Sequence, residues 1–245
     1  MDGICTSTRH TVGDDAAINT VGVYDIAAAE FLPGEIQLPY QVLHFGPVTG
    51  GGGVYFVLSG RLGEGLGYLE SATGAEPQWV HRYPAGDPMR FNLAGSAAHP
   101  TESMVYVVTK AGLIQRWWPL TRQLAPPVGI GMPEKLAIPM QHVIATASGL
   151  LLLGVSDRET ASCGLSAGIL EFGLEDGFGG DPRRAWKLEP LAEKILATKD
   201  GKSLLGLSRL DRSLSVYDVE SGERVGYLGG IGVAPMAVAG AAIAQ

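Results

Sequence analysis

The stretch LLGLSRLDRSLSVYDVESGERVGYLGG, from Leu204 to Gly230, contains three short apolar segments separated by turn residues. Leu, Val and Tyr fill the segments, and Gly, Asp and Ser bound them, which is typical of short strands joined by tight turns. Similar segments recur along the whole chain at intervals of about 8 to 12 residues. The segment EPLAEKILA, which could also form a helix, is too short to organise a domain and is predicted to be a strand. The sequence therefore predicts an all-β fold.

Five copies of one unit can be aligned along the chain. Their first segments are GICTSTR, GVYFVLSGR, SMVYVVTK, GLLLLGVSDR and GKSLLGLSR. The second segments, each after a turn or loop, are NTVGVYDI, LGYLES, LIQRWWPL, AGILEFGL and LSVYDV. The basic residues that close the first segments are about 50 residues apart, and a period of this size indicates a repeat architecture.

The unit SRLDRSLSVYDVESGERVGYL resembles the blades of WD-repeat and YVTN-type β-propellers. The matching residues are Ser208, Asp211, Ser213, Tyr217 and Asp218, with a weaker match at Thr20, Tyr24 and Asp25. The Gly-His pair that opens a strict WD repeat is absent, and Trp-Asp does not occur. The resemblance covers the whole chain as architecture and one blade as sequence. It implies a β-propeller built from four-stranded units.

Five units predict a five-bladed propeller that is closed by its two termini sharing one blade. The apolar tail APMAVAGAAIAQ would supply the inner strand that the segment GICTSTR lacks, which would leave no unpaired edge. A fragment of a seven-bladed propeller is the alternative. The expected single domain spans residues 1–245. Its blades cover roughly 1–38 with 234–245, then 39–84, 85–128, 129–188 and 189–233.

Composition restricts the partners and the compartment. A net charge of −7 and a pI of about 5.2 argue against binding of nucleic acid or anionic membranes, which require a basic surface. No apolar run is long enough for membrane insertion, and MDGICTSTRH lacks a signal-peptide pattern, so we expect a cytoplasmic protein. Cys5 and Cys163 lack metal-ligand spacing, and the five histidines show no metal motif. We therefore expect no metal and no cofactor.

A ring of basic residues is the first candidate ligand site. In a propeller, the turns that follow the second strand of each four-stranded blade lie on one face. The first segments aligned above would be these second strands. The face would therefore carry the residues that close them, namely Arg9, Arg61, Lys110, Arg158 and Arg209, with His10 beside Arg9. Their combined field would attract a small anionic ligand, which arginine can bind through paired hydrogen bonds. The alternative is local pairing with acidic neighbours, namely Asp14, Asp15, Glu64, Glu159 or Asp211.

A second candidate is an interface at Arg116 and Trp118, because Trp and Arg are frequent at binding hot spots. Trp117 and Trp118 are adjacent on a predicted strand and should face opposite sides, one of them between blades. Core packing is the alternative for both tryptophans.

These features predict a non-catalytic scaffold that binds another protein and has an anion-binding face. A propeller that binds a small ligand or sugar is one alternative, and a propeller subunit of an enzyme, such as a quinoprotein dehydrogenase or glycosidase, is the other. No pair of carboxylates is placed together by the sequence, so catalytic residues are not predicted.

Overall fold

Every regular element that the structure describes is a β-strand, as the sequence predicts. The structure, a computed structural model, describes residues 3–5, 19–25, 30–38, 41–50, 53–60, 63–70, 79–90, 93–130, 140–155, 167–175, 178–189, 192–198, 200–209 and 211–232. Within these residues, no helix is long and apolar enough to traverse a bilayer.

Four antiparallel sheets follow one another along the chain, each the size of a propeller blade. Blade 1 consists of β4 (Gln41–Pro47), β5 (Val54–Gly60), β6 (Gly63–Leu69) and β7 (Trp79–Arg82). Blade 2 consists of β8 (Leu93–Ala98), β9 (Val105–Thr109), β10 (Leu113–Trp118) and the short strands β11 (Gln123–Leu124) and β12 (Val128–Gly129). Blade 3 consists of β13 (Met140–Ala145), β14 (Leu150–Val155), β15 (Ala167–Phe172) and β16 (Arg184–Lys187). Blade 4 consists of β17 (Lys194–Ala197), β18 (Ser203–Ser208), β19 (Ser213–Asp218) and β20 (Arg224–Gly229).

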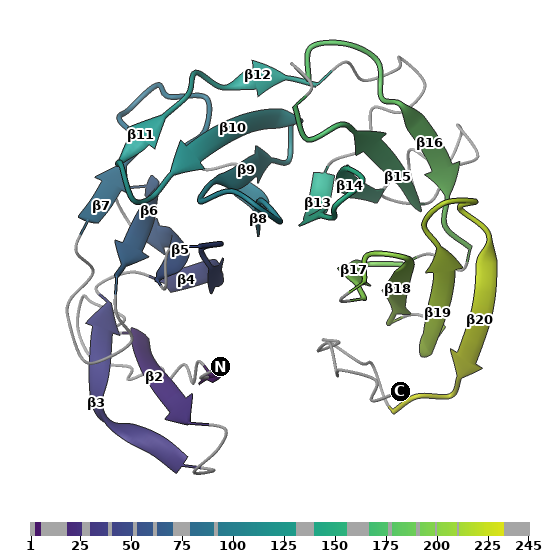
Figure 1. The fold of residues 1–245 in the computed structure, drawn as a ribbon, viewed down its shortest axis with the longest axis horizontal. Helices are drawn as coiled ribbons and strands as arrows, with labels where there is room; N and C mark the ends of the chain where they lie inside the picture. Colours follow the sequence, from purple (N-terminus) through teal and green to yellow (C-terminus); the bar gives the residue numbers. More distant parts are fainter. Residues whose placement is uncertain are drawn as a thin grey trace.

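The four blades lie side by side around an arc, as Figure 1 shows. Their first strands, β4, β8, β13 and β17, line the inner margin, and each of these strands contacts the next one along the arc. The last strands lie on the outer margin. This arrangement is that of a β-propeller.

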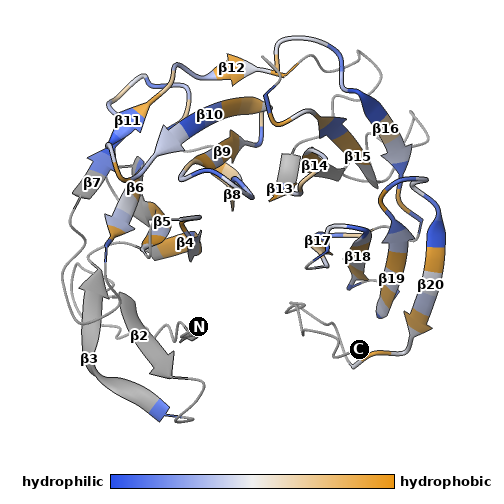
Figure 2. Ribbon diagram, viewed as in Figure 1, coloured by the Kyte–Doolittle hydropathy of each residue, from blue (hydrophilic) through white to orange (hydrophobic). Residues whose placement is uncertain are grey.

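The core lies between neighbouring blades, and strand β9 shows why. Its five residues, VYVVT, are all buried, because both faces of its sheet are covered. Val105 and Val107 pack in a cluster with blade 1, whereas Tyr106 and Val108 pack in a cluster with blade 3. Alternate side chains of a strand point to opposite faces. A strand whose sheet is covered by a neighbouring blade on each side therefore carries apolar side chains on both faces. Figure 2 shows this contrast between apolar middle strands such as β9 and polar outer strands such as β16.

The hairpins expected from the sequence repeat are all present. They pair β1 (Gly3–Cys5) with β2 (Asn19–Asp25), β5 with β6, β9 with β10, β14 with β15, and β18 with β19. The segment EPLAEKILA contributes β17, a strand as predicted.

The prediction of a five-bladed ring was wrong, because the described residues form four blades. Residues before blade 1 form a separate three-stranded sheet of β1 (Gly3–Cys5), β2 (Asn19–Asp25) and β3 (Glu30–Leu38). No strand in the described ranges joins this sheet to blade 4, where β20 pairs with β19 alone. The repeated segments in the sequence correspond to hairpins formed by two strands of each unit. A hairpin alone does not show whether an inner and an outer strand complete the blade. Residues 237–243, the expected closing strand, lie outside the described residues.

Candidate functional site

Four equivalent positions on the inner strands form the candidate site. Each inner strand ends in a turn that is closed by one backbone N–H, and these N–H groups belong to Val48, His99, Thr146 and Thr198. The residues four positions earlier in the sequence are His44, Gly95, His142 and Lys194. Each pairs with a residue on the second strand of its own blade, and these partners are Val57, Val108, Leu153 and Leu207 respectively. The shared register places them at one level of the arc. His44, Gly95, His142 and Lys194 are called the inner-strand site.

A local distortion precedes this level in three of the four blades. The register of the inner strand shifts between Val42 and His44, between Leu93 and Gly95, and between Met140 and His142. Such bulges turn the following side chain away from its regular direction, and they are frequent next to binding sites.

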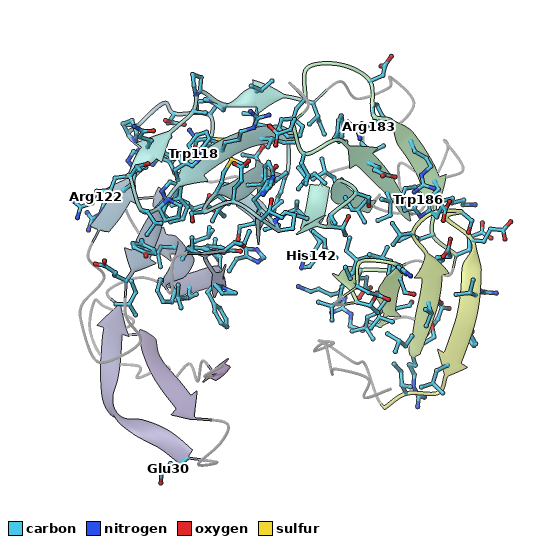
Figure 3. All side chains as sticks on the ribbon, in the orientation of Figure 1. Glu30, Trp118, Arg122, His142, Arg183 and Trp186 are labelled. Carbon is cyan, nitrogen blue, oxygen red and sulfur yellow. The ribbon has the colours of Figure 1, made fainter. Side chains whose placement is uncertain are left out.

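The rings of His44 and His142 meet although blade 2 separates their blades. Their centroids are 6.4 Å apart with an interplanar angle of 60°, an edge-on arrangement. Gly95 is the equivalent residue of the blade between them. A Cβ atom at Gly95 would lie 3.2 Å from Val143 Cγ1 and 3.4 Å from the Val143 backbone nitrogen, so the absence of a side chain lets blade 3 approach. Figure 3 shows His142 at the inner margin of the arc.

Burial keeps both imidazoles uncharged near neutral pH. Desolvation, with smaller contributions from the neighbouring His44 and the positive charge of Lys194, lowers the pKa of His142 to about 4. Desolvation also lowers the pKa of His44, with a smaller contribution from Lys194, while a hydrogen bond to the Ala94 backbone acts in the opposite direction. The Nδ1 atom of His142 is buried and has no hydrogen-bond partner among the described residues.

Lys194 brings the permanent charge of the site. It opens β17 and is exposed, and its ammonium group is near enough to lower the pKa of both histidines. The preceding acid, Glu193, is engaged elsewhere, because its carboxylate forms an ion pair with Arg209 at 3.3 Å. The negative charge of Glu193 is therefore shared with Arg209 and does not fully neutralise Lys194.

The chemistry of this arrangement favours an anion over a metal ion. A divalent cation would be repelled by the ammonium group of Lys194, and two imidazoles fall short of the three or four protein ligands that zinc sites use. An anion would be attracted by Lys194 and could accept hydrogen bonds from imidazole N–H groups.

The predicted basic ring is described at two of its positions. Arg9, His10, Arg61 and Arg158 lie outside the described residues. Lys110 and Arg209 are exposed and follow the second strands of blades 2 and 4, as expected. Arg209 pairs with Glu193 and not with the nearby Asp211, whose carboxylate accepts a hydrogen bond from Ser208 at 3.0 Å. Whether the five basic residues act together stays a prediction.

The residues of the predicted interface contact neighbouring parts of the arc. The Arg116 guanidinium lies 5.0 Å from the centroid of the Phe178 ring. Trp118 is partly buried against the cluster between blades 2 and 3, and Trp117 is fully buried in the cluster between blades 1 and 2. The two tryptophans face opposite sides, as expected. A binding role for Arg116 and Trp118 stays a prediction.

A second group of ionisable residues, at the turn after β8, is structural. The Nδ1 atom of His99 accepts hydrogen bonds from the backbone N–H groups of Thr101 and Glu102, at 3.2 and 3.0 Å. The ring proton is therefore on Nε2, which lies 3.7 Å from the Glu175 carboxylate. His99, Glu102 and Glu175 lie close enough to hold an ion, but neither nitrogen of His99 offers a lone pair. His99 therefore stabilises the hairpin turn between β8 and β9.

A cleft of about 690 Å³ lies between blades 3 and 4. Arg184, in its wall, donates hydrogen bonds to the Glu171 carboxylate at 3.0 and 2.7 Å and to the backbone carbonyls of Val219 and Glu220. Its guanidinium also stacks 4.2 Å from the centroid of the Trp186 ring. These bonds join the two blades, so this arginine is committed to the fold.

The sequence did not reveal the pairing of His44 with His142. No short motif links them, since they are on different blades. The available signal is that both histidines lie four residues before the turn that ends their inner strand, as the segments HFGPV and HVIAT show. This shared spacing is recognised only when the blades are aligned on these turns.

Comparisons with known proteins identify the architecture. No protein-family model matches the chain, and no curated protein matches it. Its fold matches 1176 solved chains, which include dihydro-heme d1 dehydrogenase NirN in complex with DHE. The TM-score with NirN is 0.58 at 17% sequence identity, over 94% of this chain and 44% of NirN, so the chain spans less than half of NirN's length.

At this identity the likeness shows a β-propeller fold and nothing about activity, because one fold carries many functions. The resemblance to the WD-repeat and YVTN families is not confirmed by these comparisons.

Proposed function

We propose that the chain is a ligand-binding β-propeller whose inner-strand site holds a small anion with a phosphate or carboxylate group. One observation carries this proposal: two uncharged histidines from separate blades meet, and the positive charge of Lys194 is near enough to lower the pKa of both. Binding sites commonly combine a largely apolar surface with a few convergent polar groups.

The three side chains have complementary roles toward an anion. Lys194 supplies a positive charge that attracts the ligand, and His44 and His142 supply imidazole nitrogens at the inner margin. A bound anion would favour protonated imidazoles and so raise their pKa.

The comparison with NirN is compatible with a binding function, since that protein carries a bound DHE molecule. NirN is named a dehydrogenase, so the enzyme-subunit alternative from the sequence analysis also stays open as a proposal. The ligand of NirN does not identify the ligand of this chain.

Calorimetric titration with inorganic phosphate tests the proposal. We expect saturable binding that strengthens as the pH falls from about 7.5 to about 5.5, because proton uptake by the histidines and anion binding favour each other. Lys194→Gln should weaken binding by about tenfold or more. The same change at Lys110, which is exposed on the predicted basic ring, should leave binding unaltered.

Two results would reject the inner-strand site. The first is the absence of saturable binding at either pH. The second is a loss of affinity in Lys110→Gln with none in Lys194→Gln, which would favour the basic ring instead.

A protein-interaction function is the second candidate. It is favoured by the outer strand β20, which exposes three large apolar side chains. Exposed apolar patches on a protein surface commonly mark interaction sites.

A further inference from the structure

Strand β20 is the outer edge of blade 4, and its side chains are unusually apolar for such a position. Val225, Tyr227 and Leu228 are 63%, 56% and 57% exposed. One edge of β20 pairs with β19, and the other pairs with no strand in the described part of the chain. Figures 1 and 2 show β20 on the outer margin, with hydrophobic residues along its length.

The outer edges of blades 2 and 3 are protected. Strand β16 has four residues, two of which are Arg184 and Lys187, and β11 and β12 have two residues each. Short length and charged side chains are the common means of preventing edge-to-edge pairing. Strand β20 has six residues, and after Arg224 it contains no charge and no proline.

The residues of β20 are complementary to themselves in one antiparallel register. A two-fold axis perpendicular to the sheet at Gly226 would place Val225 opposite Tyr227 of a second copy. The same axis would place Gly226 opposite its own symmetry mate, and residues opposed in a strand pair point to the same face of the sheet. Opposed aromatic and β-branched side chains stabilise a strand pair.

We propose that β20 pairs with β20 of a second copy of this chain to form a symmetric dimer with one continuous sheet across two blades. This inference rests on the second candidate function above and names its partner. Identical surfaces meet about a two-fold axis, as in most homodimers. Two six-residue strands bury less than a standard interface of about 1,200 to 2,000 Å². The dissociation constant should therefore be on the order of 10 to 100 µM.

Charge gives the dimer a specific salt dependence. Each chain carries a net charge of −7, so two copies repel each other at low ionic strength. Salt screens this repulsion, while the apolar contacts of β20 do not depend on it. Dimerisation should therefore strengthen between about 0.05 and about 0.5 M NaCl.

Sedimentation velocity of the full chain from about 1 to about 300 µM is the primary test. We expect a concentration-dependent shift from monomer to dimer. Val225→Lys and Leu228→Lys should weaken the dimer by about tenfold or more, since each places a charge in the pair. Leu120→Lys is the matched control, because Leu120 is 45% exposed and lies outside β20. It should behave as the unmodified chain does.

Cysteine cross-linking tests the register. In a background with Cys5→Ser and Cys163→Ser, the double variant Val225→Cys with Tyr227→Cys should form a covalent dimer under mild oxidation, because opposed residues lie within disulfide range. Either single variant should cross-link poorly, since its symmetry mate would be offset by two residues, or about 7 Å along the strand.

Three results would overturn the dimer: a monomer at all concentrations, a dimer that the lysine variants do not weaken, or cross-linking of the single variants equal to that of the double variant. If the chain is monomeric but Val225→Lys removes a different copurifying protein, self-pairing is rejected while the interaction function stands.

Discussion

Gly95 shows how one residue shapes the candidate site. Its neighbours on equivalent strands, His44 and His142, carry the polar groups, and Gly95 contributes space. A methyl group there would approach Val143 within 3.2 Å, which is closer than packed atoms normally lie. A glycine in a strand often marks such a close approach. From the sequence, Gly95 could be read only as one of 35 glycines, because its role depends on blade 3.

His142 makes the stability of the fold depend on pH. Its pKa is about 4 in the folded protein, against an ordinary value of 6.5. Between these values the unfolded chain binds more protons, so the free energy of unfolding decreases as the pH falls. The contribution is about 2 kcal/mol between pH 7 and pH 5. His44 acts in the same direction.

His142→Asn should therefore reduce the acid sensitivity of the protein. We expect the loss of stability between pH 7 and pH 5, measured by urea unfolding, to be smaller in the variant by about 2 kcal/mol. An equal loss in the variant and the unmodified chain would show that His142 titrates normally.

At the scale of strands and blades, the sequence was informative about hairpins and uninformative about their partners. The pattern of apolar segments and turn residues identified the second and third strands of each blade, because both are long and buried. The outer strands β11, β12 and β16 have four residues or fewer, and such short segments carry little periodicity. Contacts between blades, such as that of Arg184 with the turn after β19, have no local signal.

Arg184→Met tests the junction between blades 3 and 4. The change leaves the buried carboxylate of Glu171 without its ion pair and removes two bonds to blade 4. We expect a loss of about 1 to 3 kcal/mol in urea unfolding, since both charges keep some contact with solvent.

The neighbouring Arg183 is exposed, and Arg183→Met should cost less stability than Arg184→Met. Equal effects at the two positions would contradict a specific role for Arg184.

At the scale of the whole molecule, the fold class followed from the sequence and the closure did not. Five regular repeats correctly predicted an all-β propeller, because strand-forming segments and turns are local properties. The number of complete blades depends on which strands pair across the chain, and the sheet β1–β3 has the hairpin of a blade but only three strands among the described residues. The candidate site could not be predicted for the same reason, since its four residues come from four inner strands that the fold brings together.

The pKa of the His142 imidazole, followed by NMR as a function of pH with and without inorganic phosphate, tests the central claim most directly. A half-buried ring that contacts His44 and lies near Lys194 should titrate at about 4 without phosphate. Saturating phosphate should raise that pKa by about one unit or more, because a bound anion stabilises the protonated ring. A pKa near 6.5 that phosphate leaves unchanged would contradict both the buried inner-strand site and its proposed ligand.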